Sequence, residues 1–196
     1  PDGVLPVAAP HDVQEQFDAW RAESGQTPAH LVCDELWPER AVLCFKVREG
    51  DIRRWVVEED LDAWEVDATG LRKVIEVRAA TRLDDQPREA AVQDMPGATY
   101  WAAAEGDGWS VAGLLHPELL AARVGGAPIF VAMPVEGALL AWKPGDADLD
   151  KVMAVGVRKM YEEQDGPVTP VIFQWSGLSW SEFAEAVPEE EESGEQ

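Results

Sequence analysis

The chain has 196 residues, of which 46% are apolar and 28% charged, and its formal net charge is −22. The apolar fraction, together with nine tryptophans, is enough to build the core of one ordinary globular domain, which excludes an intrinsically disordered chain. The surplus of acidic residues argues against direct nucleic-acid binding and against adhesion to an anionic membrane.

Composition divides the chain into three parts. Residues 1–10 contain three prolines and one glycine and predict an extended lead-in. Residues 11–187 are expected to form a single domain, with a weak boundary in the polar stretch 84–96. Residues 188–196 carry five glutamates and no base, which predicts a disordered acidic tail. No apolar run approaches about 18 residues, and the N-terminal stretch lacks the basic start of a secretory signal, so neither a membrane span nor a signal is expected.

Apolar residues spaced three and four apart predict the helices. Residues 11–24 place Val13, Phe17 and Trp20 at this spacing, with Asp12 available as a cap. The clearest helix spans Ala68–Leu83, where Leu71, Ile75 and others form an apolar stripe. Three more helices are expected over residues 58–64, 115–124 and 147–164.

Short apolar runs on either side of glycine turns predict four β-hairpins. The first joins Ala41–Val47 to Ile52–Val57 around Gly50. The others pair residues 98–104 with 109–113, 128–133 with 138–142, and 168–175 with 179–183. Hairpins alternating with helices indicate an α+β fold of antiparallel sheets with helices packed on them. No strand–GxGxxG–helix unit is present, so a nucleotide-binding doubly wound fold is not expected.

The apolar members of these elements form the expected core. Two substitutions by Asp within it, at Leu43 and Ile129, are expected to abolish folding because each would bury an unpaired charge. The predicted core comprises Phe17, Trp20, Leu43, Phe45, Trp55, Leu71, Val74, Ile75, Trp101, Ile129, Val131, Leu140, Val152, Ile172 and Phe173.

The two cysteines predict reduced thiols in a cytoplasmic protein. Cys44 lies in the apolar run AVLCFKV and is expected to be a buried, inert thiol. The distance along the chain to Cys33 would also permit a disulfide between neighbouring segments. Two cysteines in a chain of this length do not form the dense disulfide framework of a small secreted domain.

Three templates for site chemistry match poorly. The sequence GDADLD at Gly145–Asp150 resembles the start of an EF-hand loop that would begin at Asp146. Lys151 and Val157 occupy the positions of the required Gly and Glu, so helix capping is the better interpretation. His30 and Cys33 lack a second close pair of zinc ligands. His116 stands beside Glu118 between a hairpin and a helix, where a capping or surface role is favoured over catalysis.

Exposed acids and tryptophans are the candidate partner-binding residues. The acids lie in the EEDLDAW segment, and the tryptophans stand beside Pro38 or around Gly177, where partial exposure is expected. The candidate residues are Glu58, Glu59, Asp60, Asp62, Trp37, Trp175 and Trp180.

Two stretches carry a family resemblance. One spans Ile52–Leu83 (IRRWVVEEDLDAW followed by LRKVIEVRAATRL), and the other spans Leu114–Trp180, including APIFVAMPVEGALLAW and VTPVIFQWSGLSW. In their order of elements they resemble the uncharacterised bacterial YtpQ-like family. That family ends its first helix in Ala-x-x-Asn-Leu, and here Ala79 and Leu83 match while Arg82 replaces the Asn. The resemblance implies a similar arrangement of helices and strands. The family has no assigned activity, so the resemblance implies no mechanism.

The sequence therefore predicts a non-catalytic binding or regulatory protein whose acidic surface recognises a basic protein partner, with no cofactor and no metal. Such recognition would be steered electrostatically. The alternative is a metal-dependent hydrolase that uses acidic residues with His116.

Overall fold

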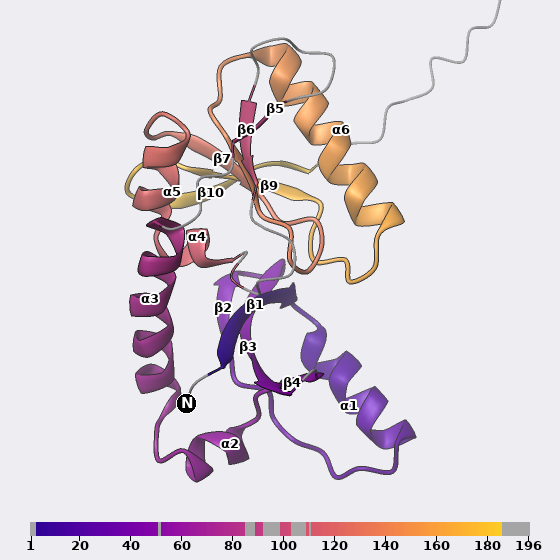
Figure 1. Ribbon diagram of the computed structural model, residues 1–196. Helices are drawn as coiled ribbons and strands as arrows, with labels where there is room; N and C mark the ends of the chain where they lie inside the picture. The colour runs from indigo at the N-terminus through magenta and orange to yellow at the C-terminus, as the bar shows by residue number, and fades with distance from the viewer. Residues whose placement is uncertain are drawn as a thin grey trace, which may run out of the picture.

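The computed structural model describes residues 3–50, 52–84, 89–91, 99–102, 109 and 111–185. These residues form six helices and ten strands, and the strands make two antiparallel sheets (Figure 1). The α+β class predicted from the sequence is confirmed.

The first sheet is built around β3 (Ala41–Glu49). Strand β1 (Val4–Pro10) pairs along one side of β3. On the other side, β2 (Cys33–Trp37) pairs with the first half of β3 and β4 (Ile52–Trp55) with the second half. The hairpin predicted around Gly50 is thus the β3–β4 hairpin.

The second sheet has the strand order β10-β9-β7-β8-β6-β5. The predicted hairpins over residues 128–142 and 168–183 are confirmed as β7–β8 and β9–β10. The strands are β5 (Glu89–Ala91), β6 (Thr99–Ala102), β7 (Ile129–Ala132), β8 (Leu140–Trp142), β9 (Val171–Trp175) and β10 (Trp180–Glu185).

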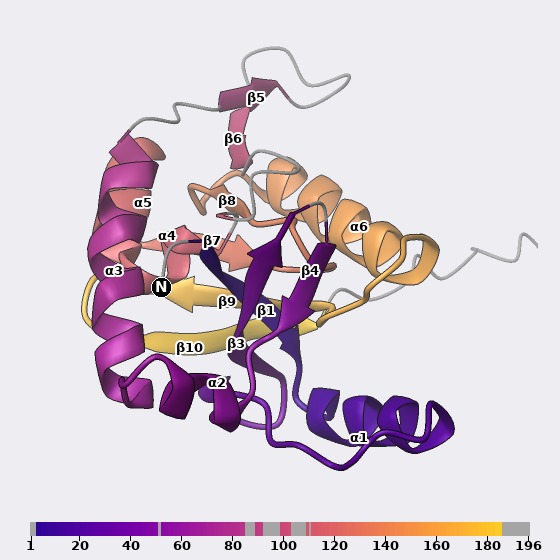
Figure 2. The same ribbon diagram turned by 60° about the horizontal axis from the view of Figure 1, so that its bottom comes forward.

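The helices cover the outer faces of the two sheets and flank one side. In Figure 1, α1 lies against the first sheet, α6 against the second, and α3 runs along the side of both; Figure 2 gives the view from below. The helices are α1 (Val13–Glu23), α2 (Glu58–Ala63), α3 (Ala68–Asp84), α4 (Ala112–Leu115), α5 (Pro117–Arg123) and α6 (Ala147–Glu163). All five predicted helical regions contain a helix.

One core is shared by both sheets. Phe45 of β3 and Phe173 of β9 belong to the same buried cluster, to which α3 contributes Leu71 and Ile75. Separate clusters lie on the opposite faces: α6 packs Leu149 and other side chains on the second sheet, and α1 packs on the first. The shared cluster binds the two sheets into one body.

Three residues of the predicted core are exposed instead. On α3 the buried stripe is Leu71, Ile75 and Ala79, so Val74 faces outward, and Val152 likewise stands beside the buried stripe of α6. Trp20 is 53% exposed because α1 buries only Val13 and Phe17, one turn earlier. Trp55 is half-buried.

Several element predictions need correction. Residues 4–10, expected as a lead-in, form a strand fully paired with β3, because VLPVAAP is apolar enough to be buried. Strand β2 was not predicted, since CDELW is not an apolar run. Residues 111–115 lead into and form α4 instead of a strand, and β6 pairs with β5 and β8. β5 lies within the stretch 84–96; the turn at 105–108 and the tail at 188–196 lie outside the described residues.

Candidate functional site

A groove of about 590 Å³ lies between α1 and the β4 strand. Its apolar wall comes from Phe17 and Trp20 on α1 and from Ile52 and Trp55 on β4. Trp20 is 53% exposed and Ile52 is 70% exposed, although both are large apolar side chains. Apolar surface left open in a concave site is typical of a place where a ligand or partner binds.

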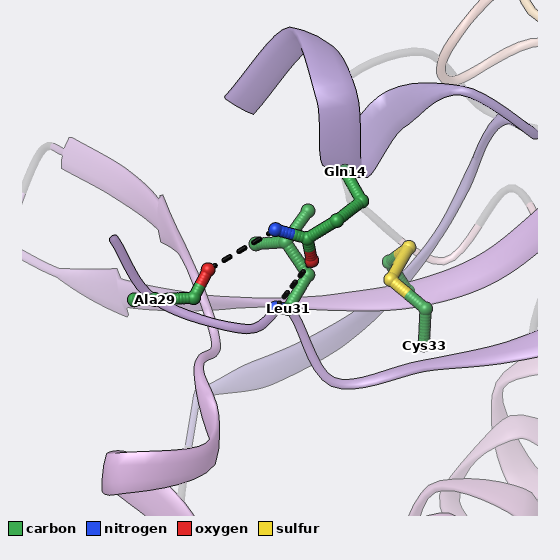
Figure 3. Close-up of a disulfide and its surroundings, with 5 residues drawn as sticks. Gln14, Ala29, Leu31 and Cys33 are labelled. Atoms are coloured by element: carbon green, nitrogen blue, oxygen red, sulfur yellow. Dashed lines mark hydrogen bonds between the residues drawn. A yellow bond between two sulfur atoms is a disulfide. The ribbon is translucent and has the colours of Figure 1, made fainter. Parts of the chain in front are cut away.

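The position of α1 is set by its contacts with the first sheet. Val13 and Phe17, four residues apart, pack into a cluster that includes Ala9 and Cys44. The Gln14 side chain accepts a hydrogen bond from the Leu31 N–H at 2.8 Å and donates one to the Ala29 carbonyl at 3.1 Å (Figure 3). These contacts hold the inner turn of α1, so the outer turn carries Trp20 over the groove.

Beneath α1, Cys33 and Cys44 form a disulfide (Figure 3). Strand pairing places the two residues directly opposite each other in β2 and β3, with Cα atoms 4.0 Å apart. The prediction of reduced thiols is therefore wrong. The prediction failed because β2 was not recognised, and only its pairing with β3 brings the sulfur atoms together.

The rim of the groove carries three arginines. Arg21, Arg53 and Arg54 line it, and none of the lining residues that the structure describes is acidic. Arg21 lies over the Phe17 ring, 5.4 Å from its centroid, and its Nε donates to the Thr27 carbonyl. In a chain with 38 acidic and 16 basic residues, three arginines along one groove are a local concentration of guanidinium groups.

Arg54 is fixed by two carboxylates. Its Nη1 and Nη2 donate to the two Asp60 oxygens at 2.6 and 2.8 Å, and its Nε donates to Glu49 at 2.8 Å. Desolvation on burial would raise the pKa of Asp60, but hydrogen bonds from Arg54 and from the Val57 N–H outweigh it and leave the pKa below 3.8. The same pairing raises the pKa of Arg54. Asp60 therefore has a structural role in joining α2 to β4.

The other three acidic candidates are exposed on α2. Glu58, Glu59 and Asp62 make no ion pair with any residue that the structure describes. They lie close to Asp60 in sequence, but they do not line the groove. The structure thus separates an acidic helix surface from the arginine-rimmed groove.

The three tryptophan candidates lie at the junction of the two sheets. Trp37 is only 5% exposed, so the expectation of partial exposure is wrong for it: its ring stacks on Phe173 and meets the edge of Trp180. Trp175 and Trp180 are half-buried. Trp37 is a core residue, and Trp175 and Trp180 pack against the same cluster.

His116 has protein partners for both ring nitrogens. Nε2 lies 2.8 Å from the Glu76 carbonyl oxygen, to which it donates, and Nδ1 lies 3.3 Å from a Glu118 oxygen. These contacts tie the start of α5 to α3.

Asp146 caps α6 by accepting from the Asp148 and Leu149 N–H groups. Within the described ranges, no group of three or more His, Cys, Asp or Glu side chains could hold a metal ion.

Comparison with family models, with curated proteins and with solved structures finds no match. The resemblance to the YtpQ-like family stays a prediction. In the part of the chain that the structure describes, no helix is long and apolar enough to cross a membrane.

Sequence reasoning missed the groove. Trp20 fits the helical stripe, which favoured a core position, and the IRRW run of β4 was interpreted only as a strand. A usable signal was present: Ile52, Arg53 and Arg54 bring an apolar side chain and two guanidinium groups to a short strand in a strongly acidic chain.

Proposed function

We propose that this protein is a non-catalytic binding protein whose groove between α1 and β4 takes a small anionic molecule with a flat apolar body. The observation that supports it is the pairing of an aromatic wall, Trp20 and Trp55, with a rim of three arginines and no acid among the described lining residues. Ligand sites commonly occupy about 300–1,000 Å³ and combine apolar walls with a few polar groups.

Each part of the groove favours one part of such a ligand. Aromatic side chains bind flat apolar groups by stacking and by burying area. Guanidinium groups bind carboxylate, sulfonate or phosphate with paired hydrogen bonds. Arg54 is held by Asp60 and Glu49 and keeps the rim in shape, while Arg53 is exposed at its edge. A cationic ligand would meet like charge there.

The test uses a matched pair of fluorescent probes. Anilinonaphthalene sulfonate is flat, apolar and anionic, and phenylnaphthylamine has the same rings without the sulfonate. The anion should bind about tenfold more tightly to the unmodified protein, a difference worth one good charged hydrogen bond. Trp20→Ala should weaken both probes, and Arg53→Gln should weaken only the anion.

Leu178→Ala is the control, because Leu178 is 97% exposed on a turn far from α1 in sequence and does not line the groove. It should leave both affinities unchanged. Equal affinities for the two probes, or loss of binding in the control as large as in Trp20→Ala, would overturn the proposal.

A second candidate function is recognition of a basic protein through α2. It is supported by Glu58, Glu59 and Asp62, which are exposed and make no ion pair within the described residues. With an oligolysine peptide as probe, Glu58→Gln/Glu59→Gln/Asp62→Asn should slow association at low salt more than the matched triple Asp148→Asn/Glu163→Gln/Asp165→Asn. The difference should disappear above about 0.15 M salt, where the screening length is about 8 Å.

The cellular location of the protein depends on the redox state of its two cysteines. A cytoplasmic location was predicted together with reduced thiols, and the Cys33–Cys44 disulfide weighs against it, because such bonds persist mainly in oxidising compartments. Thiol labelling of the protein in freshly lysed source cells tests the point: label at both cysteines supports the cytoplasm, and absence of label supports an oxidising compartment.

A further inference from the structure

We propose that a second groove, between the first sheet and α3, binds the phosphate group of a small molecule. This groove of about 510 Å³ is formed by the start of β1, the end of β3, the C-terminal half of α3 and Trp109. Its lining includes Arg48 at the end of β3 and Arg78 and Arg82, which lie one turn apart on α3. Among its described lining residues there is no acid.

Two of these guanidinium groups are available to a ligand. The side chains of Arg48 and Arg82 are exposed, and neither makes an ion pair with any residue in the described ranges. By contrast, Arg54, Arg72 and Arg158 each hold a carboxylate. In a chain with more than twice as many acids as bases, two exposed arginines that line one groove and make no ion pair within the described residues are a local departure from the pattern elsewhere in the described chain.

The shape of the groove indicates more than a free ion. Val77, one turn from Thr81, is 70% exposed and lines the groove with Trp109. A phosphate group held by the Arg48 and Arg82 forks would place an attached apolar or aromatic group against this wall. The ligand class is therefore a phosphate monoester with a small apolar body.

Isothermal titration with inorganic phosphate and with phenyl phosphate tests the proposal. Both should bind saturably, and phenyl phosphate should bind more tightly because it also covers Val77 and Trp109. Arg48→Gln and Arg82→Gln should each weaken both ligands about tenfold, the effect of losing a charged hydrogen bond. Val77→Ser should weaken phenyl phosphate and leave inorganic phosphate unchanged.

Lys73→Gln is the matched control, since it removes one positive charge from an exposed position on the same helix, outside the groove. Trp20→Ala is a second control, which separates this site from the groove at α1. All of these positions are exposed, so circular dichroism should be unchanged. Absence of saturation at millimolar phosphate, or equal weakening by Lys73→Gln and Arg82→Gln, would overturn the proposal.

Discussion

Trp37 of β2 stacks face to face on Phe173 of β9, with ring centroids 3.6 Å apart and planes 8° apart. The two residues belong to different sheets, so this stack is a direct apolar contact between the two sheets. The Trp37 indole N–H is buried and has no hydrogen-bond partner within the described residues. The Trp37 ring therefore stabilises the junction by its packing, while its unpaired N–H opposes that stabilisation.

Replacing Trp37 tests whether the packing of its ring outweighs the cost of its unpaired N–H. Trp37→Ala should lower the free energy of unfolding by about 3–5 kcal/mol, since it opens a large cavity between the sheets. Trp37→Phe keeps a stacked ring and removes the unpaired N–H, so it should cost less than about 1.5 kcal/mol. Urea unfolding measures both. If Trp37→Phe is as damaging as Trp37→Ala, the stack is not what stabilises the junction.

Removal of the Cys33–Cys44 disulfide should destabilise the fold. The bond closes a short loop with a sequence separation of 11, and a cross-link of this size contributes about 2–3 kcal/mol by restricting the unfolded chain. Thermal unfolding with and without dithiothreitol should show the loss, whereas Cys33→Ala/Cys44→Ala should be unaffected by the reductant. Two reactive thiols in denatured, unreduced protein would contradict the bond.

Asp60 should make stability depend on pH in acid. Its pKa is lowered on folding, so its carboxylate stabilises the native state above pH 3.8, and this contribution is lost as the pH falls through the lower native pKa. Asp60→Asn should therefore cost about 1–2 kcal/mol at neutral pH. The gap from the unmodified protein should begin to narrow below about pH 4 and close as the pH falls through the native pKa of Asp60. Asp62→Asn, at an exposed position, should show no such gap.

Two helical glycines should respond in opposite directions to alanine. A Cβ at Gly113 would lie 2.9 Å from a Leu139 methyl and 3.1 Å from one of Leu120, so Gly113→Ala should destabilise by about 1–3 kcal/mol. At Gly156, inside α6, a Cβ would meet nothing within 4 Å. Gly156→Ala should stabilise by about 0.5–1 kcal/mol through helix propensity alone. Melting temperatures that shift in the same direction would contradict the packing at α4.

The parts of the fold that the sequence predicts are those with local signals. The apolar stripe of α3 and the glycine turn between β3 and β4 both depend on residues close together in the chain. β1 and β2 depend instead on β3, which lies between residues 41 and 49 and supplies their hydrogen bonds. A proline-containing strand and a strand with two acids carry no sign of that pairing by themselves.

The candidate sites were harder to predict for the same reason. The periodicity of α1 places Trp20 near the buried side, but its exposure depends on where the first sheet ends beneath the helix. The grouping of Arg48 with Arg82 needs the distance between β3 and α3, which no local pattern contains. The Arg54–Asp60 pair, six residues apart, connects elements that had both been predicted, although their contact had not.

The hydrogen bonds of Gln14 have a consequence for how α1 tolerates change. Its amide presents one acceptor and one donor to main-chain atoms two residues apart, as a neighbouring peptide group would. Because both hydrogen bonds are made to backbone atoms, they do not depend on which side chains stand at positions 29 and 31. The chemistry required at position 14 is strict: Glu lacks the donor and Asn is one methylene shorter. The Gln14 side chain takes the place of a neighbouring peptide group, so a substitution at this position removes hydrogen bonds that hold the inner turn of α1 beside the groove.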